Sequence, residues 1–265
     1  MQSQRDWLFR CPKCNLYHST LMPGSGTGIE GLEDLRRANF ELMLDRVEQG
    51  RSLSGLRLLE IGSAKGWFLE AATRRGMVAQ GLEPEEANVR IARTNGLSVE
   101  SGFFPADLQD HGPYDVIAFN DVFEHLPSTV SAIKRVEELL AADGTVVINL
   151  PSSEGMLFRI ATVLAAIGFA SPFERLWQKG FPSPHIWYFS PKNLLLLVSR
   201  HTDLTLTDAF PLPSVTRSGL YDRIYSSHAG PLGRLLFAGV WLLSFALPLL
   251  PADVHVAMFK KGPQR

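Results

Sequence analysis

Between residues 56 and 150, short apolar runs alternate with segments whose apolar residues recur at helical spacing. The apolar runs predict strands at 56–61, 78–82, 97–100, 114–119 and 145–150, and the amphipathic segments predict helices at 66–75, 85–95 and 128–142. Ser128 is the expected N-cap of the last helix, and Asp143 and Gly144 are the expected turn after it. Because parallel neighbours need helical crossovers, this alternation predicts an α/β fold with a doubly wound, mostly parallel sheet.

The pattern changes on both sides of this core. Residues 1–30 are predicted to be an N-terminal appendage ending in a turn-rich linker, and residues 31–265 one domain. Insertions at about 152–185 and 211–252 are rich in apolar residues and predict a helical, apolar cap. The other predicted elements are helices over 32–47, 156–170 and 191–201 and strands over 204–209 and 254–259.

The charge balance limits the classes of partner. The 265 residues include 26 basic and 27 acidic side chains, which gives a net charge of -1. A protein that binds nucleic acid usually has a basic excess, so nucleic acid is not an expected partner. Met1 is followed by polar residues instead of an apolar leader, and two cysteines are too few for a disulfide framework. Both features favour a cytoplasmic location.

The first segment that carries chemical information joins a predicted buried strand to a glycine turn. Glu60 is followed by Gly62, Ala64 and Gly66, and such a turn lets the backbone approach a ligand at the carboxyl end of a parallel strand. A dinucleotide fingerprint would need a third glycine where Trp67 stands. The spacing fits acidic-x-Gly-x-Gly-x-Gly better, with Ala64 in the middle glycine position.

Two further strand ends carry polar side chains. Glu83 follows the second strand, where a carboxylate can accept hydrogen bonds from both hydroxyls of a ribose. The fourth strand is followed by Asn120, Asp121, Glu124 and His125. Each of these acids could instead be a solvated or capping residue at a helix start, with the histidine merely on the surface. Three such segments at one sheet edge favour a ligand site.

In this order, the three segments resemble the class I S-adenosylmethionine-dependent methyltransferases. Residues 121–126 resemble the Asp-x-x-Glu-His-Leu motif of a small-molecule group that includes quinone O-methyltransferases, and residues 139–151 and 185–194 resemble two later segments of that group. The resemblance covers about residues 32–209 and the final strand. It implies a Rossmann-like sheet of seven strands, S-adenosylmethionine as cofactor, and methyl transfer to a small-molecule or lipid-linked acceptor, with oxygen as the favoured acceptor atom.

The resemblance also implies roles for single residues. The methionine part of the cofactor, its ribose, its adenine and its sulfonium are expected near four groups of residues. The methionine part is expected near Glu60, Gly62, Ser63, Ala64 and Gly66, and the ribose near Glu83 and Pro84. The adenine is expected near Asp107, and the sulfonium near Asn120 and Asp121. His125 is the expected general base, with Glu124 or Asp121 to orient it and His185 as a second candidate. Ala64 adds a methyl group where the family usually has glycine, so slightly weaker cofactor binding is expected.

Metal sites are not expected. Asp121, Glu124 and His125 match a segment that accompanies a divalent metal in related quinone O-methyltransferases, but carboxylates beside histidine at strand ends are common without metal. Cys11 and Cys14, with His18, resemble half of a zinc ribbon. The chain has no second Cys-x-x-Cys pair, so a closed tetrahedral site lacks a ligand. We therefore predict a degenerate remnant at 1–30 without bound zinc.

The apolar segments 156–170 and 235–252 leave the acceptor and the location open. They are expected to form a cap that contacts an apolar acceptor, or to touch the inner face of a membrane. With 18 uncharged residues interrupted by Pro248 and Pro251, the second segment is borderline for spanning a bilayer. Two alternatives therefore remain, a Rossmann-like protein that binds the cofactor without turnover and a membrane-anchored methyltransferase. The sequence leaves the oligomeric state open.

Overall fold

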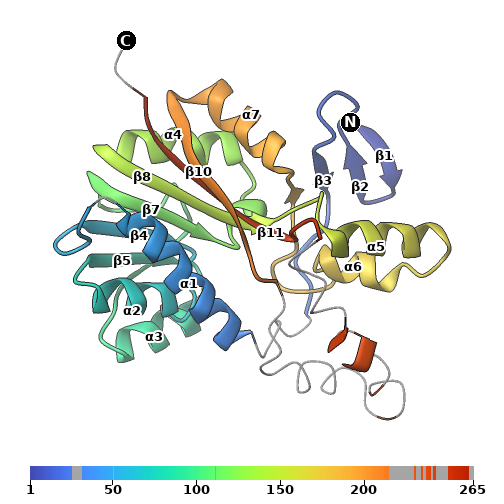
Figure 1. Ribbon diagram of the computed structural model, residues 1–265, viewed down its shortest axis with the longest axis horizontal. Helices are drawn as coiled ribbons and strands as arrows, with labels where there is room; N and C mark the ends of the chain where they lie inside the picture. Colours follow the sequence, from blue (N-terminus) through green and yellow to red (C-terminus); the bar gives the residue numbers. More distant parts are fainter. Residues whose placement is uncertain are drawn as a thin grey trace. The chain divides into compact units, whose positions relative to one another are not determined.

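Figure 1 shows the computed structural model of the chain, which divides into two compact units. The sheet unit comprises residues 40–150, 191–210 and 256–265, and the aromatic unit comprises 1–39, 151–190 and 211–255. The structure describes residues 1–25, 32–49, 51–110, 112–214, 230, 234, 237–239, 241–242 and 250–262. Most of the uncharged segment 235–252 lies outside these residues. Among the residues described, no helix has both the length and the apolar character needed to cross a bilayer.

A seven-stranded sheet forms the core of the sheet unit, in the order β10-β11-β8-β7-β4-β5-β6. Its strands are β4 (Arg57–Ile61), β5 (Val78–Glu83), β6 (Ser98–Ser101), β7 (Tyr114–Asn120), β8 (Leu140–Pro151), β10 (Leu204–Leu212) and β11 (Val254–Lys261). The pairings β4 with β5, β4 with β7, β5 with β6, and β7 with β8 are all parallel. The doubly wound, mostly parallel sheet predicted from the sequence is therefore confirmed.

The predicted helices are present at the expected places. They are α1 (Glu33–Glu48), α2 (Trp67–Arg74), α3 (Glu86–Thr94), α4 (Thr129–Leu139) and α7 (Pro191–His201). Ser128 caps α4, since its hydroxyl accepts a hydrogen bond from the Ser131 amide at 3.3 Å. In α2, Phe68, Leu69 and Ala72 are buried, as the amphipathic pattern requires.

The boundary between α4 and β8 differs from the prediction. The helix was expected to reach residue 142 and to be followed by a turn at Asp143 and Gly144, but α4 ends at Leu139 and β8 begins at Leu140. Tyr114 pairs with Leu140 while Val116 pairs with Thr145, so the four residues 141–144 on the β8 side stand against the single residue Asp115 on β7. The predicted turn is therefore an irregularity within a strand pairing.

Strand β4 lies where the sheet order reverses. It is hydrogen-bonded to β5 on one side and to β7 on the other, so the connections that leave these strands go in opposite directions along the sheet. In open α/β sheets, ligands bind outside the carboxyl ends of the strands at such a switch point. The carboxyl ends of β4, β5 and β7 are thus the place at which the topology favours a site.

The aromatic unit contains a second sheet that the sequence pattern did not predict. Strands β1 (Gln2–Arg5), β2 (Leu8–Arg10), β3 (Tyr17–Ser19) and β9 (Trp187–Tyr188) pair in this order, all antiparallel. The N-terminal appendage therefore shares one sheet with a short strand that follows the 152–185 insertion. Two helices, α5 (Met156–Ala166) and α6 (Ser171–Leu176), also belong to this unit.

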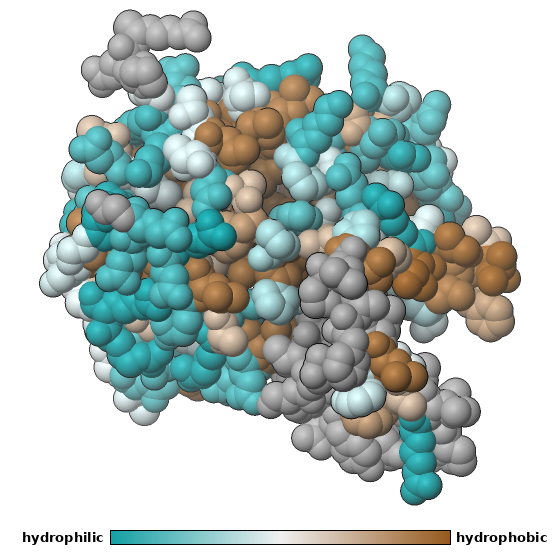
Figure 2. All heavy atoms as spheres, in the orientation of Figure 1, coloured by the Kyte–Doolittle hydropathy of each residue, from teal (hydrophilic) through white to brown (hydrophobic). Residues whose placement is uncertain are grey.

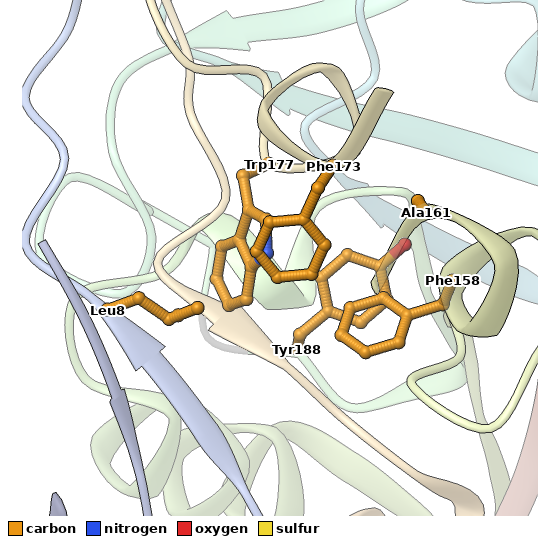
Figure 3. Packing of buried hydrophobic residues seen from close by; sticks show 6 residues of the cluster. All are labelled: Leu8, Phe158, Ala161, Phe173, Trp177 and Tyr188. Carbon is orange, nitrogen blue, oxygen red and sulfur yellow. The ribbon is translucent and has the colours of Figure 1, made fainter. Parts of the chain in front are cut away.

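Aromatic side chains form the core of this unit. Leu8, Phe158, Ala161, Phe173, Trp177 and Tyr188 are buried together, as Figure 3 shows. The Trp177 ring lies 5.2 Å from that of Tyr188 and 5.7 Å from that of Trp7, measured between centroids. Such large rings supply much of the buried apolar area in a small core. The appendage is held to α6 and β9 by this packing.

Candidate functional site

The sheet brings together predicted residues from three strand ends. Glu60 lies near the end of β4, Glu83 ends β5, and Asn120 ends β7. The Asn120 Nδ2 atom donates a hydrogen bond of 2.8 Å to Oε1 of Glu60, which joins the first and third of these ends. Both segments therefore belong to one site at the switch point.

Glu60 has an unusual electrostatic environment. Its side chain is fully buried, and burial raises the pKa of this carboxyl to about 8. The hydrogen bond from Asn120 acts in the opposite direction, and the nearby Glu83 carboxylate raises the pKa further. A carboxyl that holds its proton at neutral pH is typical of functional sites, because a core with only a structural role would avoid the cost.

Four buried oxygen atoms near this pair have no hydrogen-bond partner among the described residues. They are Glu60 Oε2, Asn120 Oδ1, Ser63 Oγ and Asn149 Oδ1. Asn149 pairs in register with Asn120, so the two side chains share a face of the sheet. Each unpaired buried polar atom costs about 1–3 kcal/mol, and all four can accept hydrogen bonds. This set of acceptors fits a ligand that carries donors and positive charge.

Asn149 is a site residue that the sequence reasoning did not single out. It stands in a strongly apolar strand and is buried. Its backbone oxygen also accepts a hydrogen bond of 3.0 Å from the Asp121 amide. A polar residue near the carboxyl end of an otherwise apolar strand was the available signal.

The glycine turn after β4 has the conformation that its residues suggest. Gly62, Ala64 and Gly66 all have positive φ, at 70°, 46° and 84°. A Cβ atom at Gly62 would overlap a methyl group of Val122 in the turn after β7. Glycine is thus required at 62 by both its conformation and its neighbour, whereas alanine at 64 occupies the left-handed region at a modest energetic cost.

Glu83 connects this turn to the end of β5. Its Oε2 accepts a hydrogen bond of 2.9 Å from the Ala64 amide, and its Oε1 accepts one of 3.0 Å from the Glu85 amide. Asn88 Nδ2 lies 3.4 Å from the same Oε1. Glu83 is buried, whereas the next residue, Pro84, is exposed. The carboxylate is therefore fixed in place beside the turn, with acceptor capacity left for a ligand.

Asp107 makes hydrogen bonds within its own loop. Its Oδ2 accepts a hydrogen bond of 2.9 Å from the Phe103 amide, and its own amide donates one of 2.9 Å to the Phe103 oxygen. The preceding residues are tied to β5, since the Gly102 amide donates to the Glu83 oxygen at 3.1 Å. Asp107 thus shapes a loop that begins beside Glu83, while its expected contact with the adenine stays a prediction.

The segment after β7 holds three of the expected catalytic residues, Asp121, Glu124 and His125. Asp121 has a positive φ of 55°, an uncommon conformation for this residue type that clusters at functional sites. Glu124 is buried and His125 half-buried, both in a short 3-10 turn, Phe123–His125. Glu124 Oε1 lies 4.0 Å from His125 Nε2. A carboxylate at this distance can stabilise a protonated imidazole. The expectation that this group works without a metal stays a prediction.

His185 belongs to the aromatic unit. Its backbone oxygen accepts a hydrogen bond of 2.5 Å from the Ser19 hydroxyl, and its Nε2 lies 3.0 Å from Gln178 Nε2. Its ring packs at 5.6 Å from that of Tyr188. These contacts give His185 a structural place in its own unit, and its catalytic role stays a prediction.

Comparison with known proteins agrees with this geometry. Residues 32–208, more than half of the chain, match a family described as a methyltransferase domain. The ubiquinone biosynthesis O-methyltransferase of Caulobacter sp. (strain K31) is 27% identical over 160 residues, which cover 57% of this chain and 60% of that protein. The match thus spans less than two thirds of that relative.

Two solved structures share the fold at low identity. The magnesium protoporphyrin IX methyltransferase of Synechocystis PCC 6803, with bound SAH, has a TM-score of 0.59 at 11% identity and covers 90% of both chains. The phosphoethanolamine N-methyltransferase 2 of Haemonchus contortus, in complex with S-adenosyl-L-methionine, has a TM-score of 0.58 at 13% identity. It covers 86% of this chain and 53% of that one. The chain belongs to the methyltransferase-domain family, and its fold and motifs are those of the class I S-adenosylmethionine-dependent methyltransferases.

Proposed function

We propose that this chain transfers the methyl group of S-adenosylmethionine to an oxygen atom of a small-molecule or lipid-linked acceptor. The observation that carries the proposal is the set of buried acceptor atoms around Glu60 and Asn120, at the switch point of the sheet. The Caulobacter relative is an O-methyltransferase by name, which supports oxygen as the acceptor atom.

The residues at this edge fit the cofactor part by part. Glu60 and Asn120 offer buried acceptors to the ammonium of its methionine portion, where an opposite charge would offset the cost of ionising Glu60. Glu83, fixed by the Ala64 and Glu85 amides, is positioned to accept hydrogen bonds from ribose hydroxyls. When bound, the cofactor supplies a methyl group already activated by its sulfonium.

The chain itself has to orient the acceptor and remove its proton. Correct orientation alone can lower a barrier by about 7–11 kcal/mol in favourable cases. His125, in the 3-10 turn after β7, takes the proton of the acceptor hydroxyl. Glu124, 4.0 Å from its Nε2, holds the ring and stabilises the imidazolium that forms.

Replacing Glu83 by Ala is expected to weaken S-adenosylmethionine binding by about 1–3 kcal/mol, roughly 5- to 150-fold, because charge-assisted hydrogen bonds to the ribose are lost. Calorimetric titration of the folded variant measures this change. Glu85→Ala is the matched control, since Glu85 is exposed and contributes its backbone amide, which the substitution keeps. Equal affinities for the wild type and the folded Glu83→Ala variant would rule out the ribose assignment.

An apolar surface in the aromatic unit supports a lipid-linked acceptor. Ile160, Val163, Ile167 and Phe169 are exposed on α5 and just after it. Figure 2 shows hydrophobic atoms gathered on this helix. Residues 156–170 contain no acid, and Arg159 is exposed among them. Exposed bulky apolar residues beside a cation are typical of proteins that bind the surface of an anionic membrane.

The Val163→Glu variant is expected to bind vesicles with anionic headgroups at least several-fold more weakly than the wild type. A charge placed in the apolar surface raises the cost of insertion into the interface. Val78→Glu is the matched control, because Val78 is 61% exposed and Val163 is 63% exposed. Sedimentation with vesicles measures the bound fraction. If the wild type stays in the supernatant, or if both variants lose binding equally, α5 is not a membrane contact.

A product scan tests the function itself. The protein would be incubated with S-adenosylmethionine carrying an isotopically labelled methyl group, and with small-molecule and lipid extracts. Mass spectrometry of the mixture is expected to find the label on the oxygen of one class of hydroxyl compound. Label on nitrogen or carbon would contradict the acceptor atom. Tight cofactor binding without any labelled product would favour the alternative of a binding protein.

A further inference from the structure

Cys11 and Cys14 lie in the loop that joins β2 to β3 in the aromatic unit. The loop is closed by two backbone hydrogen bonds, from the Cys11 amide to the Leu16 oxygen at 2.8 Å and from the Asn15 amide to the Cys11 oxygen at 2.9 Å. Asn15 has a positive φ of 62°, which allows the chain to turn back into β3 directly after the second cysteine. The four residues 11–14 are therefore held in a fixed turn.

The two thiols lie side by side in this turn. The Cys14 and Lys13 amides and the Cys14 thiol hydrogen-bond to the Cys11 sulfur, so the two sulfur atoms are neighbours. A thiolate, not a thiol, is the form that binds metals. A tetrahedral ion needs four ligand atoms held close to one another. Two neighbouring sulfur atoms at the tip of a rigid hairpin can supply two of them.

A packing role does not explain these cysteines. Structural cysteines are usually buried as small apolar side chains. Cys11 and Cys14 are instead partly exposed, and neither forms a disulfide. The core of this unit is supplied by other residues, among them Leu8, Phe158 and Trp177.

One copy of the chain holds only half of such a site. The sequence has two cysteines in total. Among the described residues, no third histidine, cysteine or carboxylate groups with this pair closely enough to share an ion. His18 is half-buried and packs on the Trp187 ring, with 4.5 Å between the ring centroids. A closed tetrahedral site therefore needs two ligands beyond the part of the chain that the structure describes.

In place of the remnant without zinc expected from the sequence, we propose that Cys11 and Cys14 form half of a tetrahedral site for a soft divalent ion such as Zn²⁺, and that the same pair of a second copy completes it. Binding joins four thiolates to one ion and releases the four thiol protons to the solvent. The resulting site carries two net negative charges. Arg10 and Lys13 of each copy flank the cysteines in sequence and offset this charge. Identical pairs related by a two-fold axis are the simplest way for one chain to close the site.

The test uses the full, untagged chain, reduced and freed of metal with a chelator. On addition of Zn²⁺ we expect one ion to bind per two chains, with the mass measured by light scattering doubling and returning to that of a monomer after chelation. Co²⁺ in place of Zn²⁺ is expected to show the absorption bands of tetrahedral coordination and of four thiolate ligands. The Cys11→Ser and Cys14→Ser variants are each expected to lose the bound ion and the dimer.

Lys13→Arg is the matched control, because it changes a side chain in the same turn but keeps its charge and removes no ligand atom, and it is expected to keep both ion and dimer. One ion per chain without dimerisation would overturn completion by a second copy. Zinc binding that persists in the double Cys→Ser variant, or no binding by the wild type, would overturn the site. These measurements involve neither cofactor nor acceptor, so their outcome is separate from that of the proposed methyl transfer.

Discussion

Replacing His125 by Asn is expected to lower turnover by about 10²–10⁴-fold while leaving the affinity for S-adenosylmethionine nearly unchanged. Asn preserves polarity at the end of the 3-10 turn, but it cannot accept a proton from an acceptor hydroxyl. The cofactor-binding residues Glu60 and Glu83 lie on other strand ends and keep their contacts. The loss should therefore fall on kcat, which a non-basic side chain cannot restore.

The measurement pairs turnover, with the acceptor found by the product scan, with the melting temperature of the same sample. His201→Asn provides the matched control, because His201 ends α7 and is exposed. His125→Ala should be about as inactive as His125→Asn. A variant that is fully active but less stable would show that His125 only packs or caps, and would leave orientation of the acceptor as the source of catalysis.

Much of the sheet unit could be predicted from the sequence, because its signals are local. The strands β4, β5, β7 and β8 are short apolar runs, and each parallel pairing requires a crossover helix that the amphipathic pattern also shows. Glycine at 62 could be read as a turn for the same reason. What the pattern could not show is that Val122 fills the space beside Gly62, since the two residues are 60 positions apart.

The aromatic unit was harder to predict, because its order depends on contacts between distant segments. Strands β2 and β3 have three residues each, too few for an alternating pattern, and they are stabilised by pairing with β9 and by packing around Trp177. The end of α4 was misplaced for a related reason. Asp143 and Gly144 are typical turn residues, but the pairing of β8 with β7 accommodates them as an irregularity.

In the candidate site, the positions of most residues could be predicted from the sequence, but their interactions could not. Glu60, Glu83 and Asn120 could be identified by their positions after apolar strands. Their interactions could not, because the protonation of Glu60 depends on burial by the whole unit and on the hydrogen bond from Asn120. Asn149 was missed because a single polar residue in an apolar strand is more often structural. Its register with Asn120 is what places it at the site.

Replacing Glu60 by Gln is expected to stabilise the cofactor-free protein above neutral pH and to weaken cofactor binding. In the unfolded chain a glutamate ionises near pH 4.3, whereas burial raises the pKa of Glu60 in the folded protein to about 8. Between these pH values the folded state binds more protons than the unfolded state, so the stability that Glu60 contributes falls as the pH rises from about 4.3 to 8. Gln cannot ionise and removes this decline.

At pH 8 the melting temperature of cofactor-free Glu60→Gln is expected to exceed that of the wild type by on the order of 5 °C, with the difference shrinking toward pH 5. Glu85→Gln makes the same chemical change at an exposed position and should show no such trend. A wild type whose melting temperature is as independent of pH as that of Glu60→Gln would contradict the raised pKa.

Cofactor binding by the wild type, unlike its stability, should become stronger as the pH rises. Glu60 must lose its proton to pair with the ammonium of the cofactor, so the affinity of the wild type should rise up to about tenfold from pH 6 to pH 7, with nearly one proton released per cofactor bound. An α-amino group ionises near pH 7.7–8.0, so the cofactor stays cationic over this range.

Calorimetry in two buffers of different ionisation heat counts the released protons. Glu60→Gln should bind more weakly, release none and lose the pH dependence, because its amide offers the ammonium an acceptor without a charge. Proton release equal in the wild type and the variant would mean that the proton comes from another group and that Glu60 does not meet the ammonium.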